Sequence, residues 1–104
     1  MLDPNEIWSE FCALVAADQG LDEVPTQWTR ETLFIGGLVG DDGKVLDINW
    51  TDFMSIEFAV RRKWEINLPE RNWQTLLSDG TLGKMTLGTI FDEVVQALSQ
   101  QLPA

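Results

Sequence analysis

Apolar positions near the start of the chain recur every three or four residues, which is the spacing of one face of an α-helix. They are Ile7, Phe11, Leu14 and Val15. Asp3 can cap this helix, and Pro4 suits its first turn, where a backbone N–H has no partner inside the helix. Gly20 is a natural stop, because glycine adopts the left-handed conformation after a helix at little cost. The pattern therefore predicts a first helix between Asp3 and Gly20.

Two further apolar stripes at helical spacing lie in the second half of the chain. The earlier stripe consists of Phe53, Ile56, Val60 and Trp64. The later stripe consists of Leu87, Ile90, Phe91, Val94 and Leu98. We expect the earlier helix to begin near Thr51, with Asn49 or Thr51 as its cap, and Thr86 to cap the last helix. The segment ERNWQTLLSDG (70–80) predicts a short helix between them that ends at Gly80.

Residues 21–49 form a long and mixed segment that is punctuated by a proline and several glycines. LFIGGLV and KVLDIN flank the GDDG turn (40–43), and the two could pair as a short β-hairpin. The competing interpretation is a folded loop whose Leu33, Phe34 and Leu38 hold it to the core. We favour the loop, with hairpin character at its tip. With no strong set of strands elsewhere, the chain is predicted to be one all-α domain over residues 1–104, a helical bundle.

The order of these elements resembles that of an acyl or peptidyl carrier protein. That family has a long first helix, a long loop, a second helix, a short third helix and a closing helix. TLGTIFDEVV (86–95) is similar to the closing-helix pattern of the family, with Thr, Gly, two apolar residues, Asp and an apolar residue in the same order. FAVRRKWEINLPE (58–70) resembles the end of the second helix, and ETLFIGGLVG (31–40) loosely resembles the loop before it. The resemblance implies a carrier-like four-helix bundle.

The resemblance also implies a phosphopantetheine arm on the serine of an Asp-Ser-Leu motif, at the start of the second helix. Helix N-termini favour phosphate through their free N–H groups and dipole. Counting back from Pro69 without gaps puts the serine slot at Trp50, and matching the apolar pattern instead puts it at Asp52. Neither residue has a hydroxyl. The remaining attachment candidates are two nearby hydroxyls, those of Ser55, in M-S-I-E, and Thr51. The helix after Ser55 would be short for the family, and Thr51 is explained by its place as a helix cap. We expect the arm to be absent, and therefore no cofactor.

The start of the second helix is the expected docking surface for a partner, through Trp50, Asp52 and Phe53. The end of this helix carries Arg61 and Arg62, a basic turn where the carrier family is acidic. We favour the interpretation of this turn as a solvated face near a helix C-terminus, where positive charge is favourable. As a docking feature, it would mean a partner surface different from that of a standard carrier.

Composition narrows the chemistry further. The chain has no histidine and a single cysteine, Cys12, so it lacks the commonest general base and cannot form an internal disulfide or a cysteine-cluster metal site. We therefore predict that it is not an enzyme and holds no metal. The net charge of −10 repels nucleic acid and anionic membranes. No apolar run is long enough to span a bilayer and the N-terminus lacks a signal pattern, so a cytoplasmic location is expected.

The predicted function is non-enzymatic binding of another protein, such as an enzyme that recognises carrier domains. Two alternatives remain open. The first is a genuine carrier that is modified at Ser55 in an unusual context. The second is an acidic inhibitor, such as an immunity protein, that binds a basic partner with electrostatic steering.

Overall fold

The computed structural model describes residues 3–40, 42–46, 48–68 and 73–101. It contains the helices α1 (Pro4–Asp18), α2 (Trp50–Trp64), α3 (Trp73–Asp79) and α4 (Leu87–Gln101), with the short 3-10 helix η1 (Leu82–Lys84) between α3 and α4. Over this part of the chain no strand forms, and β pairing is limited to two isolated bridges. The prediction of an all-α chain is therefore confirmed, and the first and last helices lie where their apolar stripes predicted. Within these ranges no helix has the length and apolar character needed to cross a membrane.

The caps that fix α1 are those expected from the sequence. The carboxylate of Asp3 accepts the N–H of Asn5 at 2.9 Å, which satisfies one of the free donors at the start of the helix. At the other end Gly20 has a φ of 77°. The N–H of Leu21 bonds to the carbonyl of Ala16 and the N–H of Gly20 to that of Ala17. This pair of hydrogen bonds is a Schellman motif, and it ends α1 at Asp18, with Gln19 as the C-cap and Gly20 after it.

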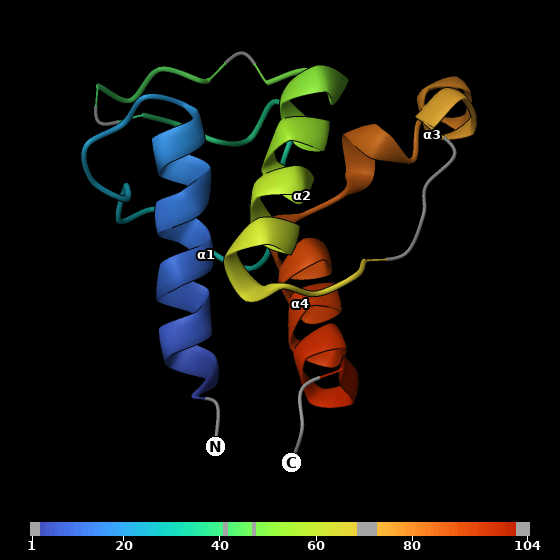
Figure 1. Cartoon of the computed structure of the whole chain (residues 1–104). Coiled ribbons are helices and arrows are strands. Elements are labelled where there is room, and N and C mark those ends of the chain that lie inside the picture. Colours follow the sequence, from blue (N-terminus) through green and yellow to red (C-terminus); the bar gives the residue numbers. More distant parts are fainter. Residues whose placement is uncertain (1–2, 41, 47, 69–72, 102–104) are drawn as a thin grey trace.

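Three helices surround the core. α1 packs against both α2 and α4, and the start of α1 lies at the same end of the molecule as the end of α4 (Figure 1). α3 lies to one side, beyond the 3-10 helix that it contacts (Figure 1). Aromatic side chains join these layers: the Trp8 and Phe91 rings meet edge to face with centroids 5.1 Å apart. The apolar stripe of each long helix therefore faces a common cluster of buried side chains.

The long connection between α1 and α2 is a folded loop with a hairpin-like tip. Val39 and Val45 form an antiparallel bridge, and the N–H of Leu46 bonds to the carbonyl of Leu38 at 2.7 Å. Phe34 and Leu38 are buried as predicted, but Leu33 is 41% exposed, so the prediction that it holds the loop to the core is wrong. Leu33 contributes through its backbone instead, in an antiparallel bridge to Thr86.

That bridge belongs to a longer contact between the loop and the start of α4. Phe34 N–H bonds to Met85 O, Leu87 N–H to Thr32 O, and Gly88 N–H to Arg30 O, at 2.8 to 2.9 Å. The Arg30 side chain continues the contact, because its guanidinium lies 2.7 Å from Asp92 and 5.4 Å from the centre of the Phe91 ring. The closing helix is thus attached to the loop by backbone pairing, with a partly exposed ion pair at its edge.

Candidate functional site

The N-terminus of α2 is closed by its own side chains. Asn49 Oδ1 accepts the N–H groups of Thr51 at 2.9 Å and Asp52 at 3.2 Å, while the Asp52 carboxylate accepts the Asn49 N–H at 3.0 Å. This is a capping box, and the first helical residue is Trp50, one earlier than Thr51. The donors that could hold a phosphate are partly used by Asn49, and the Asp52 carboxylate adds negative charge where a phosphate would lie.

Ser55 lies in the second turn of α2, away from the helix terminus. Its hydroxyl is exposed and donates a hydrogen bond of 2.9 Å to Asp18 Oδ1 at the end of α1. A phosphate ester on this oxygen would lie against the Asp18 carboxylate, and like charges at that distance repel. The Ser55 hydroxyl therefore links α2 to α1 through its hydrogen bond to Asp18. The carboxylate beside it disfavours an anionic arm at this position.

The three residues expected to dock a partner at the start of α2 do not form one surface. Phe53 is 0% exposed and its ring centroid lies 4.7 Å from that of Phe34. The prediction that Phe53 contacts a partner is wrong, because α2 turns it toward the core with Ile56 and Val60. Asp52 is used in the cap. The side chain of Trp50 lies outside the described residues.

The opposite face of α2 carries large apolar side chains in solvent. Met54 is 39% exposed and Phe58 is 59% exposed. The two are one helical turn apart and therefore adjacent on the surface. The Arg62 guanidinium lies over the Phe58 ring, 5.8 Å from its centre. Met54 and Phe58 were not among the residues predicted to bind a partner, although apolar residues four apart and out of phase with the core stripe indicate an exposed apolar pair.

The basic turn divides between two faces of α2. Arg61 is half-buried and Arg62 is exposed, and helical spacing puts both beside Phe58. Lys63 points elsewhere, with its ammonium 5.5 Å from the centre of the Trp64 ring. Among the described residues neither Arg61 nor Arg62 forms an ion pair, whereas Arg30 is paired with Asp92. We name Met54, Phe58, Arg61 and Arg62 the α2 outer face.

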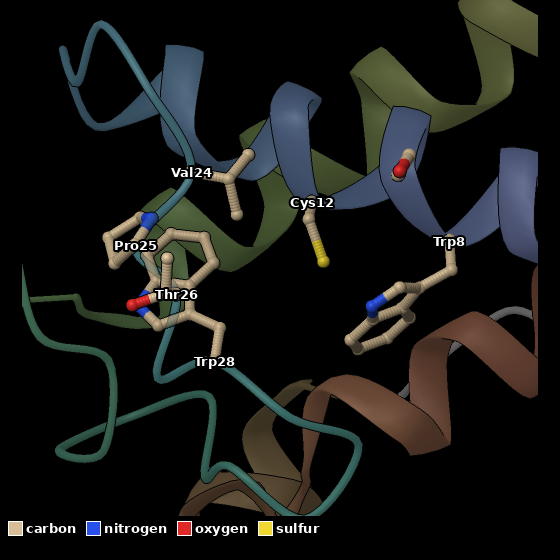
Figure 2. Close-up of a pocket in the computed structure, with 7 residues that line it drawn as sticks. Trp8, Cys12, Val24, Pro25, Thr26 and Trp28 are labelled. Atoms are coloured by element: carbon tan, nitrogen blue, oxygen red, sulfur yellow. The ribbon is translucent and has the colours of Figure 1, made fainter.

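A shallow pocket of about 220 Å³ lies between α1 and the loop that follows it. Figure 2 shows the Cys12 sulfur directed toward the space between the indoles of Trp8 and Trp28. The Trp28 indole is fixed by a 2.8 Å hydrogen bond from Nε1 to the Val39 carbonyl. Burial raises the pKa of the Cys12 thiol to about 12, because an apolar environment disfavours the thiolate. Cys12 thus lines the pocket as an uncharged thiol and is unsuited to act as a nucleophile.

Metal chemistry finds no support in the described ranges, where no group of three or more His, Cys, Asp or Glu side chains could hold an ion. One acidic side chain on α2, Glu57, is only 3% exposed. It interacts with other groups of the chain, and it lies on the core side, away from the α2 outer face.

Comparison of the chain with protein-family models, with curated proteins and with solved structures finds no match in any of the three.

Proposed function

We propose that the chain is a non-enzymatic, carrier-like helical domain that works without a phosphopantetheine arm and binds another protein through the α2 outer face. The observation that carries this proposal is the exposure of Met54 and Phe58 side by side on one helix. Exposed aromatic side chains flanked by arginine are typical anchors of protein interfaces.

The absence of an arm is supported by the start of α2. The ungapped count from Pro69 puts the serine slot at Trp50, which is also the first residue of the helix. A tryptophan there cannot accept the arm. Of the remaining hydroxyl candidates, Ser55 faces Asp18, so the alternative of a genuine carrier modified at Ser55 has the less favourable electrostatics.

Binding through the α2 outer face follows from the cost of leaving these side chains in water. Burying a Phe side chain contributes roughly 1.5–3 kcal/mol relative to exposure. In the described structure Phe58 does not contribute this burial free energy, because the face of α2 that packs into the core is the opposite one, with Phe53 and Ile56. The Arg62 guanidinium lies over the Phe58 ring, 5.8 Å from its centre, and Phe58 is still 59% exposed. A partner that covers Met54 and Phe58 would realise the gain.

Site-specific photo-cross-linking tests this proposal. A photoreactive amino acid is placed at position 58 and, as the matched control, at position 13, where exposed Ala13 lies on α1. In cells that make the chain, we expect a discrete cross-linked species from position 58 and none from position 13. The captured protein is then purified and its affinity measured by calorimetry.

With the purified partner, Phe58→Ser is expected to weaken binding at least about tenfold, because an interface anchor is worth more than about 1.4 kcal/mol. The variant should fold normally, since Phe58 is mostly exposed. Equal cross-linking from both positions, or an affinity that Phe58→Ser leaves unchanged, would contradict the proposal.

A further inference from the structure

We infer that the partner of the α2 outer face presents an acidic amphipathic helix, whose apolar side chains cover Met54 and Phe58 and whose carboxylates pair with Arg61 and Arg62. This inference rests on the proposed function and adds the chemistry of the partner. It is the reverse of what the net charge of −10 suggests, which is a basic partner.

The dimensions of the face fit a helix. Arg62 lies eight positions after Met54, which at a rise of 1.5 Å per residue is about 12 Å, or slightly more than two turns. The apolar pair lies in the first part of this distance and the two arginines in the second. A partner helix with apolar residues four apart, followed by Glu or Asp one turn later, matches both parts in a single register.

The arginines are available for such pairing. Arg30 is an example of an ion-paired arginine in this chain, because its terminal nitrogen lies 2.7 and 2.9 Å from the two Asp92 carboxylate oxygens. The Arg62 guanidinium lies over the Phe58 ring, and within the described ranges no carboxylate pairs with Arg61 or Arg62. A cation–π contact with the ring does not consume the guanidinium N–H groups as hydrogen-bond donors, so they can still bind a carboxylate.

The charge elsewhere on the chain confines an acidic partner to this face. The sequence has 17 acidic and 7 basic residues, and three of the seven basic residues are consecutive at 61–63. A negative surface is therefore repelled over most of the molecule and attracted near the end of α2. Such a combination of local attraction and general repulsion fixes register and excludes other binding modes.

A basic partner is disfavoured at the same place. Covering Met54 and Phe58 brings the partner within a few ångströms of Arg61 and Arg62. A cation there would be repelled, and the two guanidinium groups would lose water without gaining a carboxylate. A second copy of the chain is disfavoured too, because two molecules with a charge of −10 repel each other.

The inference is tested with three fluorescent, helix-stabilised peptides of about 14 residues, or roughly four turns. All three carry leucines four apart, and they differ only in having Glu, Gln or Lys at the flanking positions. Binding is measured by anisotropy near physiological salt to the wild-type chain, to Phe58→Ser and to the double variant Arg61→Glu/Arg62→Glu. Far-UV circular dichroism checks that the variants fold.

We expect the Glu peptide to bind wild type about tenfold more tightly than the Lys peptide, since two favourable charge contacts replace two unfavourable ones. The double variant should invert this order, and Phe58→Ser should weaken the Glu peptide. Tighter binding of the Lys peptide, no binding of the Glu peptide at millimolar concentration, or a Glu-peptide affinity unchanged in the double variant would overturn the inference. So would a dimer in sedimentation that Phe58→Ser abolishes.

The two proposals can fail separately. If position 58 cross-links a protein but the peptides prefer lysine, the face is correct and the partner chemistry is wrong. If no species is cross-linked from position 58 in preference to position 13, the proposed function fails, and the inference fails with it.

Discussion

The hydroxyl of Ser55 donates a hydrogen bond of 2.9 Å to Oδ1 of Asp18, and this bond joins the second turn of α2 to the end of α1. The serine that most nearly echoes an attachment site therefore already has a structural role. Its neighbour is a carboxylate, which is the wrong charge for a phosphate ester.

Replacing Ser55 tests this role. Ser55→Ala should lower the free energy of unfolding by about 0.5–1 kcal/mol relative to Ser99→Ala, measured by urea denaturation. Both serines are exposed and helical, and Ser99 shows no side-chain hydrogen bond in the described structure, so the gain in helix propensity should cancel between them. Equal stabilities of the two variants would mean that the bond to Asp18 contributes nothing.

Gly88 is required by the pairing of the loop with α4. A Cβ at this position would lie 2.7 Å from the Arg30 carbonyl oxygen, the atom that accepts the Gly88 N–H at 2.9 Å. Gly88→Ala should therefore destabilise the fold by roughly 1–3 kcal/mol, because the backbone must shift. In Gly83→Ala the added Cβ meets nothing within 4 Å, and that variant should be neutral or slightly stabilising in thermal unfolding. Similar melting temperatures would contradict the packing at Gly88.

The capping box gives Asp52 a structural role that differs from its expected role in docking. Asp52→Ala and Asn49→Ala should each lower the free energy of unfolding by about 1 kcal/mol, since each removes one half of the box. Once the partner is identified, Asp52→Ala should leave its affinity within about twofold, unlike Phe58→Ser. A large loss of affinity in Asp52→Ala, with normal stability, would show that Asp52 contacts the partner, as the sequence first suggested.

Cys12 should be almost unreactive in the folded chain. Burial raises the pKa of its thiol from 9.0 to about 12, so at pH 8 the thiolate fraction is about a thousandfold lower than in the unfolded chain. Labelling with a chromogenic disulfide should be slower than labelling in denaturant by at least this factor. Because the folded pKa is the higher one, the thiol's contribution to stability is complete below pH 9 and is lost as the pH rises toward 12. Equal labelling rates in both states would contradict the burial.

Local signals predicted the helices well, because caps and stops act over a few residues. Asp3, Gly20, Asn49 and Thr86 each perform the terminal role expected of them; the Thr86 hydroxyl, for example, accepts the Thr89 N–H at 3.2 Å. The amphipathic pattern of α2 also predicted the position of Phe53 correctly, because Phe53 is in phase with the core residues Ile56 and Val60. The docking role was inferred instead from its place beside the expected serine slot.

The candidate surface was harder to predict, because exposure depends on contacts between distant segments. Leu33 looked like a core residue, but the bridge to Thr86 uses its backbone and turns its side chain toward solvent. Phe58 is out of phase with the predicted core stripe of α2, but the local pattern does not say whether another segment of the chain covers it. Ser55 and Asp18 are 37 residues apart in the sequence, so no local pattern indicates that they are in contact.

The proposal that this domain works without a tethered arm can be decided by an intact-mass measurement. The chain is incubated with coenzyme A and a broad-specificity phosphopantetheinyl transferase, with a working carrier protein in the same tube. We expect the carrier to gain one phosphopantetheine and this chain to keep its mass. A gain of one arm on this chain, mapped to Ser55, Thr51 or any other hydroxyl, would contradict the proposal and show that the chain is a functional carrier.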